Sequence, residues 1–193
     1  MEIKRSTILG ITISLAVALL AFTAYASVTN ILAVGTIPDS QLFGGPATVT
    51  VRTLTIKPGE VLAWHYHPGY AFNVVKSGTL TVEEGCGGEE SLTPGQAFEE
   101  MAGHVHRAKN LSATEDVVVY NTFIMPQGKA TTANIPGNER RCGPPSNVDE
   151  CKNDGWLKFD HPSSFINQGQ CIDYVSHRPR NVIPVPEDPL GQN

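Results

Sequence analysis

Short runs of β-branched and aromatic residues alternate with tight turns from residue 48 to residue 125. The runs cover residues 48–56, 61–67, 70–75, 79–83, 96–99, 105–109 and 116–125. Pro-Gly pairs at 58–59, 68–69 and 94–95 and a glycine-rich tip at 85–88 separate several of them. Such pairs favour tight turns. Because no 3.6-residue repeat of apolar positions competes with this spacing, the pattern predicts an all-β fold built from antiparallel strands.

The segments on either side of these runs have a different composition. Residues 27–46 are mixed and are expected to form an edge strand and a loop, so the predicted barrel covers residues 27–128. Residues 129–148 are polar and rich in Gly, Pro and Asn, which is typical of a linker loop. Residues 149–177 hold two cysteines and several aromatic residues and are interpreted as a small stapled appendage. Four prolines make residues 178–193 an expected extended tail.

The first 26 residues have the pattern of a secretory signal peptide. Lys4 and Arg5 precede an uncharged apolar run from Ile8 to Ala24, and Ala24-Tyr-Ala26 is typical of a cleavage site. The alternative is an uncleaved membrane anchor, because the run is close to the shortest length that spans a bilayer. The pattern predicts a secreted or periplasmic protein with no stable membrane span after cleavage.

Charge and cysteine content agree with an exported domain. The formal net charge of the 193 residues is −5 without clusters of Lys or Arg, which argues against nucleic acid as a partner. Four cysteines in an exported chain indicate two disulfides, with three possible connectivities. We expect Cys151 to pair with Cys171 across the aromatic segment, which leaves Cys86 with Cys142. A Cys86–Cys151 bond would instead tie the appendage directly to the barrel.

Three histidines carry the candidate chemistry. His65 and His67 are two residues apart in a predicted strand, so their side chains share a face. His106 lies in a later predicted strand and can meet them if the sheet closes on itself. Three neutral imidazoles that converge inside a barrel form a transition-metal site with open coordination positions.

The spacing of these residues resembles that of the cupin superfamily. The first family motif, G-x5-H-x-H-x3-E-x6-G, falls on Gly59, His65, His67, Ala71 and Gly78, and the second, G-x5-P-x-G-x2-H-x3-N, falls on Gly95, Met101, Gly103, His106 and Asn110. The resemblance covers roughly residues 45 to 128. It implies an antiparallel jelly-roll of six to eight strands with a metal ion near its centre.

Ala71 is the departure from this pattern that matters most. The family usually has a glutamate ligand at that position, and a methyl group cannot bind a metal, so the resemblance implies a three-histidine variant. Imidazole suits divalent Fe, Cu, Ni or Zn better than Mn. Up to three positions of an octahedral ion would remain for a small ligand or O₂. The alternative is that the histidines are hydrogen-bonded interior residues that hold no metal.

Other polar residues near the motifs give weaker indications. Asn73 is expected to point inward, and His104 can share a face with His106 but is interpreted as a rim residue. The pairs 83–84, 89–90 and 99–100, all Glu-Glu, are interpreted as solvated faces. None of these residues is identified as a catalytic acid or base. The sequence therefore predicts an exported metal-binding cupin with a small ligand in its barrel, and a metal-dependent dioxygenase is the alternative.

Overall fold

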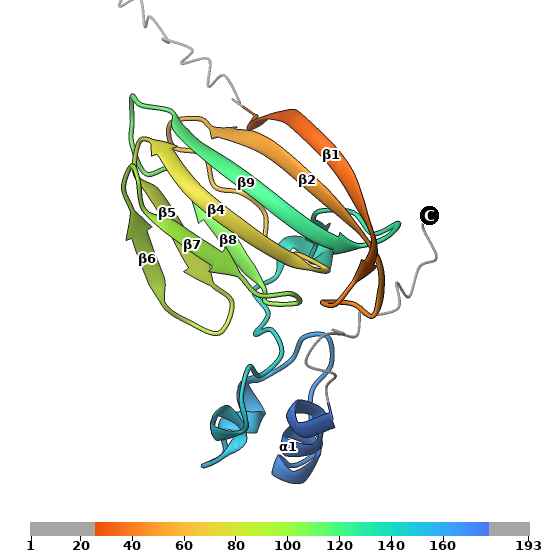
Figure 1. Cartoon of the computed structure of the whole chain (residues 1–193). Coiled ribbons are helices and arrows are strands. Elements are labelled where there is room, and N and C mark those ends of the chain that lie inside the picture. The colour runs from red at the N-terminus through yellow and green to blue at the C-terminus, as the bar shows by residue number, and fades with distance from the viewer. Residues whose placement is uncertain (1–25, 178–193) are drawn as a thin grey trace, which may run out of the picture.

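Two five-stranded antiparallel sheets face each other in the computed structural model, which describes residues 26–177 (Figure 1). The strands are β1 (Val28–Ser40), β2 (Gly45–Ile56), β3 (His65–Tyr66), β4 (Tyr70–Ser77), β5 (Leu80–Glu84), β6 (Glu89–Leu92), β7 (Ala97–Glu100), β8 (His106–Lys109), β9 (Val117–Pro126) and β10 (Ala133–Asn134). The predicted signal peptide, apart from its last residue, and the predicted tail lie outside the described residues.

The strand order confirms the predicted all-β jelly-roll. One sheet has the order β1-β2-β9-β4-β7 and the other has the order β10-β3-β8-β5-β6. Several neighbours in each sheet are far apart in the chain, as β2 and β9 are, because the chain crosses between the sheets. The sheet order also brings β3 beside β8, and these two strands carry the histidine motifs.

The predicted strand at 61–67 is much shorter than expected. Only His65 and Tyr66 are in regular pairing. The Leu62 amide donates to the carbonyl of Ala108, whereas the Trp64 amide donates to the side chain of Asn138. The segment therefore has different hydrogen-bond partners along its length. Regular strand pairing is limited to two residues.

The interior of the barrel has an apolar part and a polar part. Along β9 the inward positions begin with the buried residues Val117 and Val119 and continue with Asn121. On the neighbouring β4, Val75 packs in the same apolar cluster and Asn73 is buried beside Asn121. A polar layer thus crosses the barrel at the level of these two amides, and this layer positions the candidate site.

The chain after β9 is only partly a loop. Its short β10 pairs with β3 and so joins the second sheet. Its helical turns and helix are η1 (Pro136–Asn138), η2 (Val148–Cys151), η3 (Gly155–Lys158) and α1 (Gln168–His177). Figure 1 shows α1 and the turns before it beyond one end of the barrel. No helix within residues 26–177 is both long enough and apolar enough to cross a membrane.

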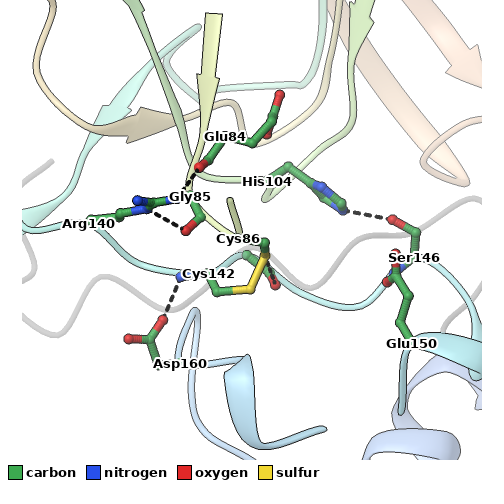
Figure 2. Close-up of a disulfide and its surroundings, with 10 residues drawn as sticks. Glu84, Gly85, Cys86, His104, Arg140, Cys142, Ser146, Glu150 and Asp160 are labelled. Atoms are coloured by element: carbon green, nitrogen blue, oxygen red, sulfur yellow. Dashed lines mark hydrogen bonds between the residues drawn. A yellow bond between two sulfur atoms is a disulfide. The ribbon is translucent and has the colours of Figure 1, made fainter. Parts of the chain in front are cut away.

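Both expected disulfides are confirmed. Cys151 pairs with Cys171 inside the appendage, and Cys86 pairs with Cys142. Two disulfides indicate an oxidising location outside the cytoplasm. Figure 2 shows that the second bond joins the β5–β6 hairpin tip to the segment that follows β10.

Hydrogen bonds reinforce that junction (Figure 2). Arg140 donates from Nε to the carbonyl of Gly85 at 2.9 Å, and the Cys142 amide donates to an Asp160 oxygen at 2.6 Å. The segment around Cys142 is therefore fixed to the barrel by a disulfide and a hydrogen bond, and Asp160 of the appendage is hydrogen-bonded to this segment.

Candidate metal centre

The three motif histidines meet inside the barrel. His65 and His106 are directly opposite each other in the β3–β8 pairing, and their ring centroids are 4.5 Å apart. His67 follows β3, with its ring centroid 5.0 Å from that of His106 and 5.2 Å from that of His65. All three residues are buried, and one nitrogen from each ring lies within 4.8 Å of the others. This group could hold a metal ion.

Backbone carbonyls fix the orientation of each imidazole. Each Nδ1 lies against a carbonyl oxygen: His65 against Ala63 at 2.8 Å, His67 against Thr131 at 2.5 Å, and His106 against His104 at 3.0 Å. A carbonyl oxygen can only accept, so each Nδ1 carries a proton and donates it. The lone pair of each neutral ring is then on Nε2, which is the usual arrangement of histidines that bind metals.

A carboxylate that the sequence interpretation treated as solvated lies at this site. The Glu100 side chain is 11% exposed, with Oε1 2.9 Å from His106 Nε2 and Oε2 3.1 Å from His67 Nε2. Its neighbour Glu99 is exposed, as the interpretation expected. Adjacent residues of a strand point to opposite faces, so one member of the pair had to face inward. The half-buried Phe98, two residues before Glu100, indicates which one.

Polar side chains from the first sheet hold this carboxylate. Asn73, expected to point inward, donates from Nδ2 to Glu100 Oε2 at 3.0 Å. Asn121 donates to Asn73 Oδ1 at 2.7 Å and accepts from Arg52 Nε at 3.1 Å. The Arg52 guanidinium also lies over the ring of Phe123 at 4.5 Å. The network fixes the orientation of the Asn73 amide and, through it, that of Glu100.

Ala71 lies beside the site, as its motif position implies. It is fully buried and packs with Phe123 and Met125. The Phe123 ring is 5.0 Å from that of His67. The place of the family's usual glutamate is thus filled by an apolar contact against one of the histidines.

Burial and mutual charge set the protonation of the site. Burial, reinforced by the charges of His106 and His67, lowers the pKa of His65 to about 3. Burial opposes ionisation of Glu100, but His106 and His67 outweigh it and hold the pKa of that carboxyl well below its usual range. Burial also lowers the pKa of His106, but the charge of Glu100 outweighs it and raises that pKa above 6.5. The carboxylate is therefore ionised and His65 is neutral near pH 7.

A cavity of about 240 Å³ adjoins the site. Its lining includes His65, His67, Glu100, Arg52 and Asn121. Pockets for drug-sized molecules are typically about 300–1,000 Å³. The cavity thus has room for a small organic molecule next to the histidines.

His104 is not part of the histidine group. Its Nε2 lies 3.1 Å from the hydroxyl oxygen of Ser146 (Figure 2). Its carbonyl nevertheless holds His106, so the residue contributes to the site through its backbone. The interpretation of His104 as a rim residue agrees with this position.

The chain is similar to one protein family and to several proteins of known structure. The family model, described as the cupin domain, matches residues 52–123. One similar structure is an uncharacterized conserved protein with a double-stranded β-helix domain from Klebsiella pneumoniae (22% identity, covering 58% of this chain and 86% of that chain, TM-score 0.44). Another is a cupin superfamily protein from Desulfitobacterium hafniense (11% identity, covering 52% and 79%, TM-score 0.41). Among curated proteins, none matches the chain.

Proposed function

Residues 52–123 form a cupin superfamily domain, and on that premise we propose that this chain binds one divalent transition metal ion through His65, His67 and His106. The observation that carries the proposal is the convergence of three buried imidazoles whose Nδ1 atoms all donate to carbonyls. That arrangement leaves three Nε2 lone pairs for one ion.

The buried Nε2 of His106 supports this assignment. It makes no hydrogen bond within residues 26–177, even though a Glu100 oxygen lies 2.9 Å away. Buried polar atoms without a partner are rare in folded proteins. A metal ion bound at Nε2 would supply a well-aligned partner beside the Glu100 carboxylate.

The bound ion would serve to hold a small ligand. The cavity of about 240 Å³ lies against His65 and His67, so a ligand in it has access to the free coordination positions of the ion. Metal capture with ligand binding is the function that this geometry supports best. Because the cavity is next to the ion, a metal-dependent dioxygenase acting on a small organic molecule is the second candidate. Oxygen consumption by the metal-loaded protein in the presence of small organic molecules separates the two.

Metal content tests the proposal. Wild-type protein dialysed against one divalent metal at a time should retain about one ion per chain for the imidazole-preferring metals Fe, Cu, Ni or Zn. His65→Ala with His106→Ala should retain almost none, whereas His177→Ala, at an exposed position in α1, should match the wild type. Circular dichroism in EDTA verifies that each variant folds. Equal metal content in the double variant and the wild type contradicts the proposal.

We also place the protein in the periplasm or outside the cell, after removal of residues 1–26. Support comes from the apolar run between Arg5 and Ala24 and from the two disulfides. N-terminal sequencing of exported protein should begin at Ser27. An intact Met1 on membrane-associated protein would show an anchor instead.

A further inference from the structure

The position opposite Ala71 in the barrel is occupied by a carboxylate. In the pairing of β4 with β7, the Cα partner of Ala71 is Glu100. Directly opposed residues of antiparallel strands point to the same face, with Cβ atoms about 4.5–5.5 Å apart. Glu100 therefore lies on the strand next to the position of the usual family glutamate, and its side chain points to the same interior.

The contacts of Glu100 have the spacing of ligands around one ion. Two ligand atoms at right angles on an ion with bonds of about 2.1 Å lie about 3.0 Å apart. The Oε1–His106 Nε2 and Oε2–His67 Nε2 distances are 2.9 and 3.1 Å. The contact with His106 lacks the alignment of a hydrogen bond, and Asn73 donates a hydrogen bond to Oε2. The two carboxylate oxygens thus lie at ligand spacing from the Nε2 atoms of His106 and His67.

The ion-pair partners of this carboxylate within residues 26–177 are the histidines His106 and His67, which are charged only when protonated. No Lys or Arg among residues 26–177 forms an ion pair with Glu100, and the nearest cation in its network, Arg52, is separated from it by Asn121 and Asn73. A buried charge is costly unless it is paired or bound to a metal. A divalent cation at the histidines would supply a pairing that does not depend on histidine protonation.

We propose that Glu100 is the fourth protein ligand of the metal and replaces, from the neighbouring strand, the glutamate that Ala71 lacks. The inference rests on the proposed metal binding by the three histidines. The site is then a three-histidine, one-carboxylate centre, and Asn73 is a positioning residue that holds the second carboxylate oxygen. A hard oxygen ligand extends the range of ions to Mn²⁺, which the three-histidine interpretation disfavoured.

Mn²⁺ binding gives the sharpest test. Glu100→Gln keeps the shape of the side chain and an oxygen for Asn73 but removes the charge, and Glu99→Gln makes the same change on the exposed face of β7. Mn²⁺ affinity is measured from the free-ion electron paramagnetic resonance signal, and Zn²⁺ affinity by competition with a chromophoric chelator. Loss of an outer partner of a metal ligand costs 10–100-fold in affinity, so loss of the ligand itself should weaken Mn²⁺ binding by about 100-fold or more.

The outcomes separate this inference from the proposed function. We expect wild type and Glu99→Gln to bind Mn²⁺ alike, and Glu100→Gln to lose Mn²⁺ while it retains weaker Zn²⁺ binding. If Glu100→Gln binds both ions as the wild type does, Glu100 is not a ligand and the three-histidine proposal stands. If the wild type binds neither ion, the proposed function fails and the inference fails with it.

Discussion

Each histidine of the site is oriented by a hydrogen bond from its Nδ1, the ring nitrogen that is not proposed to bind the metal. The Nδ1 atoms of His65, His67 and His106 all donate to main-chain carbonyls, so the ring orientations depend on backbone geometry rather than on other side chains. Two of these carbonyls lie only two residues before the histidine that they hold. The motif spacing thus provides the ligand and its orientation together.

The protonation of His106 predicts the pH dependence of metal affinity. A metal must displace the proton from Nε2, and Glu100 raises the pKa of His106 above 6.5. Below that pKa, Zn²⁺ affinity should fall by about tenfold per pH unit for the one proton released. His65 does not contribute, because its pKa of about 3 leaves it neutral throughout this range.

Titration calorimetry with Zn²⁺ between pH 5.5 and 8.5, in buffers of different ionisation enthalpy, measures both the affinity and the number of protons released. An affinity that stays constant across this range, without proton release, would show that His106 is not a ligand.

Strand pairing explains which parts of the site could be foreseen. Most of the strands follow from local runs, although the one predicted at 61–67 is regular only at His65 and Tyr66. The meeting of His65, His67 and His106 follows from their fixed spacing. Glu100 was missed because its role depends on the register of β7 against β4, which pairs it with a residue 29 positions earlier in the chain. No local pattern specifies that register. The same limit applies to Thr131, whose carbonyl reaches His67 from a segment interpreted as a linker.

The two disulfides act on different elements, which predicts different losses on their removal. In the chain-entropy account, the separations of 56 residues for Cys86–Cys142 and 20 residues for Cys151–Cys171 correspond to about 4 and about 3 kcal/mol. Replacing Cys151 and Cys171 by Ser should loosen α1 and the adjacent turns but leave metal affinity unchanged. Replacing Cys86 and Cys142 by Ser should lower the unfolding free energy of the barrel.

Chemical denaturation and hydrogen exchange of both double variants measure these effects. Loss of protection in the barrel strands of the Cys151/Cys171 variant would contradict the assignment of that bond to the appendage alone.

At the scale of the whole molecule, the site lies where the two sheets face each other. The histidines come from the sheet that contains β3 and β8, whereas Glu100, Asn73 and Asn121 come from the other. The apolar cluster that includes Ile56 and Val119 closes the barrel on one side of this polar layer. A metal bound by both sets would therefore link the sheets across the barrel, and the cavity beside it would be the place where a ligand reaches the ion.

The most direct test is a crystal structure of metal-loaded protein, with diffraction recorded on both sides of the absorption edge of the added metal. We predict one anomalous peak per chain, with the Nε2 atoms of His65, His67 and His106 and one oxygen of Glu100 about 2.0–2.2 Å from it. A peak at another position, or no peak at a saturating metal concentration, would contradict a metal centre inside the barrel.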